Sequence, residues 1–244
     1  MGLALISILA FGPMVFAADE PAPPASPTEG LKSETELGLV LTSGNSKTST
    51  TNIKQGTSYE WSGNTLRLQA RFLRTSTRGT ESAKNYGLGL RYERALTDAL
   101  SIYVGQALES DTYAGYLQKH NSDVGGKYFF MKSEETVASA ELGYRYTIEN
   151  TVLGTQNKSH YLRAYLEALR NWNRWVSMKA SLEILPNLTY AADYQVNGEI
   201  SLAAIISSLF SLKTSYAIRY DHVPAAGAPE TTDTTLTTAL VVRI

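Results

Sequence analysis

Few residues in this chain have the type and spacing that catalysis would need. The sequence contains three histidines and no cysteine, which excludes thiol catalysis, thiolate zinc sites and disulfide scaffolds. A hydrolytic site needs a histidine within hydrogen-bond reach of a serine and oriented by Asp or Asn. His120 with Asn121, Ser122 and Asp123, or Ser159 with His160, supplies these residue types.

The local pattern works against both arrangements. Neighbouring residues of a strand point to opposite faces, so Ser159 and His160 do not meet side by side. His120 and Ser122 share a face, but Val124 lies on the same face. We therefore expect the histidines, including His222, to be residues near strand ends, and we predict no catalytic residue. A lipid hydrolase at the rim of the fold remains an alternative.

Carboxylates near strand ends and loops could bind divalent cations. Isolated loop carboxylates are usually solvated, however, and no calcium-loop spacing is present. We predict no metal site and no cofactor. The carboxylates in question are Asp111, Glu134, Glu135, Glu149, Asp193, Asp221, Glu230 and Asp233.

Composition narrows the class of protein further. The chain has 244 residues, with 22 Lys and Arg against 23 Asp and Glu. A net charge of −1 argues against nucleic-acid binding, which needs a basic surface. Charged residues make up 18% of the chain, below the roughly 25% usual for soluble domains.

The N-terminal region is typical of an exported protein. Residues 3–16 are uncharged and almost wholly apolar, a run shorter than the roughly 20 residues that a membrane-spanning helix needs. We predict a signal peptide over residues 1–18, although no Lys or Arg precedes the apolar run. Residues 19–32 are predicted to form a flexible spacer because of their high proline content.

From residue 33 to residue 244 the dominant hydrophobic period is two, which predicts an all-β domain. About twelve strands of roughly ten residues or more, separated by short turns, are typical of a closed antiparallel up-and-down transmembrane β-barrel. Ten strands are the next alternative. The expected strands cover residues 35–42, 49–61, 65–74, 85–94, 100–108, 118–131, 136–148, 161–168, 176–184, 194–203, 209–222 and 234–244.

Alternation alone does not show whether the apolar face points inward or into lipid, since soluble lipocalin-like barrels and membrane barrels share the same period. Twelve long strands exceed the eight of lipocalin-type barrels. Charges of both signs lie mid-strand on the polar face, where they can pair across a lumen, whereas a Lys or Arg at bilayer depth costs about 2–4 kcal/mol. The charges of this predicted lumen network are Arg67, Arg71, Arg91, Glu93, Asp123, Lys127, Glu141, Arg145, Arg163, Glu167, Lys179, Glu183, Glu199, Lys213, Arg219 and Asp221.

Tyrosine and tryptophan recur near strand ends on the apolar face. Amphipathic rings in such places form aromatic girdles at the level of lipid headgroups, although tyrosine is also a common strand residue anywhere. The predicted girdle residues are Tyr86, Tyr92, Tyr144, Tyr146, Trp172, Trp175, Tyr216 and Tyr220.

Residues 36–46 (ELGLVLTSGNS), 86–93 (YGLGLRYE) and 183–188 (EILPNL), together with the alternating final strand, resemble the YdiY-like salt-induced outer-membrane proteins, a family of unknown function. The resemblance covers nearly all of the chain after the spacer. It implies a β-barrel in the Gram-negative outer membrane, linked to osmotic or salt response, and brings no catalytic residues. Outer-membrane barrels usually end on an aromatic residue that the assembly machinery reads, whereas this chain ends on Ile244.

We therefore expect a monomeric outer-membrane barrel, with a lumen filled or narrowed by paired charges, that serves envelope adaptation or passage of small solutes. Its expected partners are outer-membrane lipid, lipopolysaccharide and the barrel-assembly machinery. The alternatives are the lipid hydrolase and a soluble periplasmic ligand-binding barrel with an apolar core.

Overall fold

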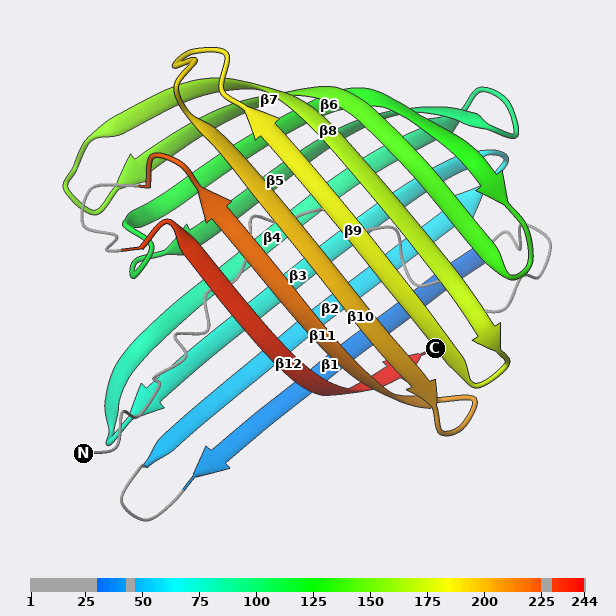
Figure 1. The fold of residues 1–244 in the computed structure, drawn as a ribbon, viewed down its shortest axis with the longest axis horizontal. Helices are drawn as coiled ribbons and strands as arrows, with labels where there is room; N and C mark the ends of the chain where they lie inside the picture. Colours follow the sequence, from blue (N-terminus) through cyan, green and yellow to red (C-terminus); the bar gives the residue numbers. More distant parts are fainter. Residues whose placement is uncertain (1–29, 43–46, 225–229, 244) are drawn as a thin grey trace.

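The computed structural model describes residues 30–42, 47–224 and 230–243. These residues form twelve antiparallel strands joined to their sequence neighbours, and the ring closes between the first strand and the last (Figure 1). The predicted fold, a closed all-β barrel of about twelve strands, is confirmed. The strands are β1 (Gly30–Thr42), β2 (Thr48–Trp61), β3 (Asn64–Thr77), β4 (Thr80–Ala95), β5 (Leu100–Asp111), β6 (Tyr116–Lys132), β7 (Thr136–Thr151), β8 (Gln156–Asn173), β9 (Val176–Pro186), β10 (Tyr194–Ile205), β11 (Phe210–Asp221) and β12 (Thr232–Arg243).

The first strand begins earlier than the sequence pattern indicates. β1 starts at Gly30, five residues before the expected strand over residues 35–42 and three before the predicted start of the domain at residue 33. Lys32 still pairs with Ser58 of β2 and binds Glu60 at 3.1 Å. The predicted signal peptide and nearly all of the predicted spacer lie outside the described residues, as do Ile244 and most of the turn after Thr42. Within the described residues, no helix is long and apolar enough to cross a membrane.

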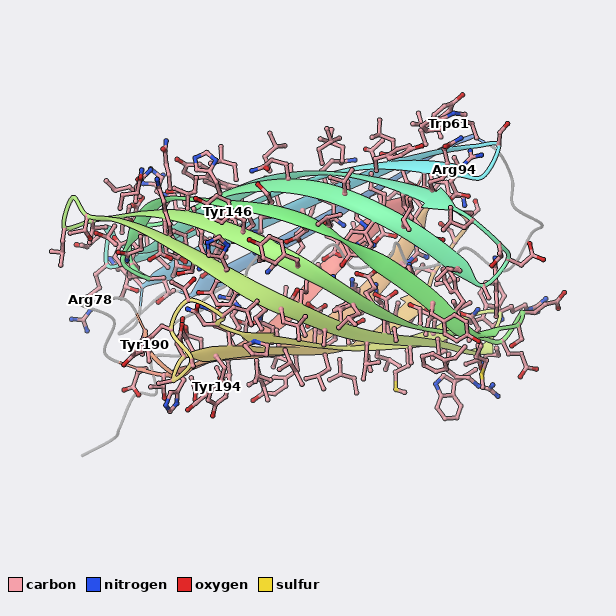
Figure 2. All side chains as sticks on the ribbon, turned by 90° about the horizontal axis from the view of Figure 1, so that it is seen from above. Trp61, Arg78, Arg94, Tyr146, Tyr190 and Tyr194 are labelled. Carbon is pink, nitrogen blue, oxygen red and sulfur yellow. The ribbon has the colours of Figure 1, made fainter. Side chains whose placement is uncertain are left out.

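The barrel buries its charges and exposes its apolar side chains. On β4 the burial alternates residue by residue, with Asn85, Arg91 and Glu93 buried while Leu88 and Leu90 are about half exposed. The same reversal of the usual globular pattern runs through the other strands, and Figure 2 shows side chains projecting from the outer surface along the barrel. The period-two pattern therefore places the polar face inside.

A tyrosine and two glycines shape one part of the interior. Tyr103 of β5 pairs with Gly125 of β6, and Gly125 pairs with Gly143 of β7. The Tyr103 ring lies across both glycines: a Cβ placed on Gly125 or Gly143 would stand 2.6 Å or 2.5 Å from the tyrosine oxygen. The glycines thus provide the space that lets Tyr103 reach Arg163 on β8, which donates to the tyrosine oxygen at 3.0 Å.

We predict that Gly125→Ala destabilises the barrel by about 1–3 kcal/mol, the usual cost of overpacking. The added methyl group would lie 2.6 Å from the backbone oxygen of Leu142 as well as from Tyr103, and a backbone atom cannot move aside cheaply. Denaturant unfolding followed by tryptophan fluorescence measures the loss.

Gly126→Ala is the matched control, because its added methyl group would have its nearest contact at 3.8 Å, on the backbone oxygen of Ser101. Equal stability of the two variants would contradict the assigned role of the Tyr103 contact.

Candidate functional site

The interior of the barrel centres on one carboxylate shared by two arginines. Glu141 of β7 accepts a hydrogen bond from Arg91 of β4 at 2.8 Å and another from Arg163 of β8 at 2.6 Å. Both arginine side chains are 1% exposed and Glu141 is 2% exposed. Burial of a charge this complete is tolerated only when opposite charges and hydrogen bonds replace water.

The network continues across the neighbouring strands. Arg163 donates to Glu183 of β9 at 2.6 Å, and Arg145 of β7 approaches the same carboxylate at 3.3 Å. Arg145 also binds Asp123 of β6 through two bonds of 2.7 and 2.8 Å. This fork-to-fork geometry fixes the orientation of the guanidinium group as well as its charge. Five strands, β4, β6, β7, β8 and β9, are therefore cross-linked by one chain of alternating charges.

Long side chains reach over glycine to bind partners two or more strands away. Arg71 of β3 lies in register with Gly87 of β4, which lies in register with Glu109 of β5, and Arg71 binds Glu109 at 2.6 Å. Arg91 is likewise in register with Gly105 of β5, and its guanidinium lies 3.8 Å from the centre of the Tyr103 ring in a cation–π contact.

Further ion pairs extend around the lumen. They join Arg67 to Glu93 at 3.3 Å, Arg91 to Glu93 at 3.2 Å, Lys119 to Glu149 at 3.2 Å, Lys179 to Glu167 at 3.1 Å, and Lys213 to Glu36 at 2.9 Å. Beside these charges, the inner face of β1, β2, β11 and β12 carries smaller buried residues, which include Thr50, Asn52, Ser58, Ser211, Ser215, Thr235 and Ala239.

The structure places every charge of the predicted lumen network on the inner face of its strand. Four of them, Lys127, Glu199, Arg219 and Asp221, have no ion pair among the described residues, and the Lys127 ammonium lies over the Phe129 ring, 4.6 Å from its centre. Glu199 and Arg219 have neither an ion pair nor a hydrogen bond to a described residue, and the buried Arg219 Nε has no hydrogen-bond partner. Asp221 accepts a hydrogen bond from the uncharged Gln195 at 3.0 Å.

The predicted girdle residues lie on the outer surface. Tyr92, Trp172 and Trp175 lie toward the end of the barrel where β1 begins and β12 ends, while Tyr86, Tyr144, Tyr146 and Tyr220 lie toward the opposite end and Tyr216 lies near the middle of β11. Figure 2 shows Trp61 near one end of the barrel and Tyr190 and Tyr194 near the other. Rings also stack at both ends, with Tyr59 against Trp61 and Tyr194 against His222.

The histidines take part in aromatic contacts. His160 contacts the hydroxyl of Tyr144 through Nδ1 and packs against Tyr146. His222 hydrogen-bonds to the hydroxyl of Tyr220 at 2.8 Å. His120 lies on the outer face of β6, and Ser122 donates to Gln106 rather than approaching a histidine. In the described part of the chain, no serine is bonded to a histidine.

The carboxylates weighed as cation ligands lie apart from one another or already have partners. Asp111 accepts from the Asn85 amide and from two backbone N–H groups of its own turn, and Asp193 accepts from Asn187. Residues 30–42, 47–224 and 230–243 contain no group of three or more His, Asp or Glu side chains arranged to hold a metal ion.

Two residues central to the network are absent from the sequence-based set. Tyr103 links Arg91 to Arg163, and Glu109 binds both Arg71 and Asn121. Extending the period-two alternation over β5 would have placed both on the inner face. Their long-range partners carry no sequence signal, because they lie two or three strands away.

A closed barrel with paired charges inside and apolar side chains outside has the architecture of outer-membrane channels. It can be superposed on an outer-membrane channel from Pseudomonas putida F1 with a TM-score of 0.55 and 11% identity, over 94% of this chain and 98% of the other. The NanC porin gives a TM-score of 0.50 and 10% identity, over 87% and 97% of the two chains. These likenesses concern the fold.

Residues 35–244 match the model of a family described as protein of unknown function, DUF481. The chain therefore belongs to this family. No curated protein matches the sequence.

We predict that Glu141→Gln destabilises the barrel by about 3–5 kcal/mol, since removing one charge of a buried pair leaves its partners uncompensated. Here the partners are Arg91 and Arg163. Denaturant unfolding of the purified protein measures the difference.

Glu135→Gln is the control, because Glu135 is 70% exposed and its pair with Arg170 is 3.1 Å long. Breaking an exposed pair costs at most about 1 kcal/mol. A Glu141 variant as stable as the Glu135 variant would show that the central network does not hold the strands together.

Proposed function

We propose that the protein is an integral outer-membrane β-barrel with a lumen narrowed by its charge network, which admits small solutes at most. The observation that carries the proposal is the reversed burial pattern: Arg91 and Arg163 are 1% exposed, whereas Leu88 is 51% exposed. A soluble barrel with an apolar core has the opposite arrangement. The same observation disfavours the soluble ligand-binding alternative.

The loops support an orientation for the barrel. β1 begins and β12 ends at the same end, where the turns between strands span two to four residues, as at residues 62–63 and 206–209. The longest connections, residues 187–193 and 222–231, lie at the other end. Outer-membrane barrels have short periplasmic turns and longer extracellular loops, so we place the termini in the periplasm.

The proposed surroundings follow from this orientation. The outer rings, including Tyr92, Trp172 and Tyr144, would lie near lipid headgroups and lipopolysaccharide as two girdles. The barrel-assembly machinery would insert the chain as a monomer after removal of the signal peptide. A role in the adaptation of the envelope to salt is supported by the resemblance of residues 36–46, 86–93 and 183–188 to the YdiY-like salt-induced proteins.

The histidine contacts do not favour the hydrolase alternative. His160 and His222 are hydrogen-bonded to tyrosines. Ser122, the serine considered as a partner of His120, donates to Gln106 instead. A general base would have to be within hydrogen-bond reach of its nucleophile. We propose that these histidines belong to the aromatic belt of the barrel.

We predict that the protein recovered from the membrane fraction migrates differently on SDS gels before and after boiling. A barrel in which every strand pairs with two neighbours keeps its backbone hydrogen bonds in detergent until it is heated. Recovery of the protein in the soluble periplasm, with unchanged migration, would overturn the proposal.

We further predict only small conductance steps in planar bilayers, well below those of sixteen-stranded porins, since barrel diameter grows with strand number and large charged side chains occupy part of this lumen. A wide, constantly open pore would contradict the narrow lumen. The Glu135→Gln variant should leave the steps unchanged, because Glu135 lies in the turn between β6 and β7.

A further inference from the structure

The closure of the barrel between β1 and β12 covers only part of the two strands. Among the described residues, their ladder has four pairs, from Glu34 with Arg243 to Leu37 with Leu240. Continuing the same register would pair residues 38–41 with residues 239–236, but these residues form no ladder pair with each other. Each of these stretches pairs only on its other side, with β2 or with β11. Figure 1 shows β1 and β12 diverging from the end where β12 finishes.

Exposure changes at the point where the ladder ends. Leu37 and Leu240, the last pair, are 46% and 39% exposed. Leu39, the next outward-facing residue on β1, is 66% exposed, and Leu236, two outward positions before Leu240 on β12, is 64% exposed. Val40 shares the inner face of β1 with the buried Glu36, yet it is half exposed. The exposed inward-facing Val40 marks the opening, since Leu142 on β7, which is paired on both sides, is 62% exposed and so resembles Leu39 and Leu236.

An unsatisfied amide lies where the ladder ends and β12 is still close to β1: a Cβ placed on Gly38 would lie 3.6 Å from Asn52 Nδ2 and 3.5 Å from the backbone oxygen of Thr238. Asn52 of β2 pairs with Gly38, the first residue of β1 beyond the ladder. Asn52 is 4% exposed, and neither its Nδ2 nor its Oδ1 has a hydrogen-bond partner in the part of the chain that the structure describes. Buried polar groups are usually bonded, so an orphaned donor and acceptor on one side chain call for an explanation. A ligand that both donates and accepts would satisfy both atoms.

The charges beside Asn52 are already matched within the protein. Glu36 accepts from Lys213 at 2.9 Å and lies 3.7 Å from Lys54, while Glu34 binds Arg243 at 2.8 Å. A ligand at the seam would thus need uncharged hydrogen-bonding groups for Asn52 on the inside and an apolar part against the leucines on the outside. Bilayer lipid alone offers the apolar contact but leaves strand edges without hydrogen bonds, which is costly at membrane depth.

We propose that the open half of the β1–β12 seam is a lateral portal that binds a single-chain amphiphile with an uncharged, hydroxyl-bearing head. The head bonds to Asn52 and to the free strand edge, and the hydrocarbon chain lies outside against Leu39, Leu41 and Leu236. The portal connects the lumen with the outer half of the bilayer. This assignment rests on the proposed function, because it requires the outer face to lie in lipid with the termini in the periplasm.

The first experiment tests the opening itself with paired cysteines, which the native chain lacks. A disulfide needs Cα atoms no farther apart than about 7 Å. In membranes, Thr35→Cys with Val242→Cys, a pair inside the ladder, should oxidise to a disulfide. Leu41→Cys with Leu236→Cys should stay reduced and react with maleimide. Rapid oxidation of both pairs would overturn the portal.

The second experiment tests the ligand with a photoactivatable 1-monododecanoylglycerol in vesicles that contain the protein. Adducts should concentrate on residues 37–41 and 236–240 and fall at least fivefold in Asn52→Leu. Labelling spread evenly around the barrel, or unchanged in Asn52→Leu, would overturn the site. A photoactivatable dodecanoate should label these residues less than the glycerol ester, and stronger labelling by dodecanoate would refute the uncharged head.

Each sample is also run unboiled and boiled on SDS gels. If migration changes on boiling but the seam cysteines oxidise or the seam is not labelled, the portal is rejected and the proposed function stands. If migration does not change on boiling, the proposed function is rejected. The same gel shows whether Asn52→Leu has folded. In the event that it has not, Asn52→Asp replaces it. Removing the amide donor should then reduce labelling by the glycerol ester at least threefold, and unreduced labelling would contradict the role of Asn52.

Discussion

The rest of this structure depends on the mutual neutralisation of charges that have been taken out of water. With apolar side chains outside, the polar half of every strand is directed into a confined interior, where an unpaired ion is expensive. Glu141 neutralises Arg91 and Arg163 at once, and Glu183 pairs with both Arg163 and Arg145. Because the partners come from different strands, satisfying the charges also fixes how the strands are arranged around the lumen.

Glycine makes these long-range pairs geometrically possible. Adjacent strands are about 4.8 Å apart, so an arginine that binds a carboxylate two strands away must pass over the residue between them. Gly87 occupies that position between Arg71 and Glu109, and Gly125 with Gly143 does so for Tyr103. The glycines on one strand and the long side chains that pass over them from neighbouring strands are therefore parts of one arrangement. Among the described residues, Asn52 beside the β1–β12 seam is the one buried side chain with both a donor and an acceptor atom left without a hydrogen-bond partner.

The strand pattern could be predicted from sequence because apolar residues recur at every second position over nearly the whole chain. On β4, for example, Leu88, Leu90 and Tyr92 alternate with residues that include Arg91 and Glu93. The same alternation indicated which charges would face inward. It could not indicate which of them pair, since the contact between Arg91 and Glu141 depends on side chains crossing β5 and β6. Nor could it reveal that β1 and β12 stop pairing after Leu37, because both strands keep their alternation beyond that point.

The central claim, that the apolar face meets lipid and the polar face does not, is tested most directly by spin labels on β10. Ile200 and Leu202 are about half exposed on the outer face, whereas Ser201, between them, is 3% exposed on the inner face. In reconstituted membranes, single-cysteine labels at Ile200 and Leu202 should be relaxed strongly by oxygen dissolved in the lipid and weakly by a water-soluble nickel chelate. A label at Ser201 should show little relaxation by oxygen. Strong relaxation of the Ile200 and Leu202 labels by the nickel chelate would place this face in water and contradict the account.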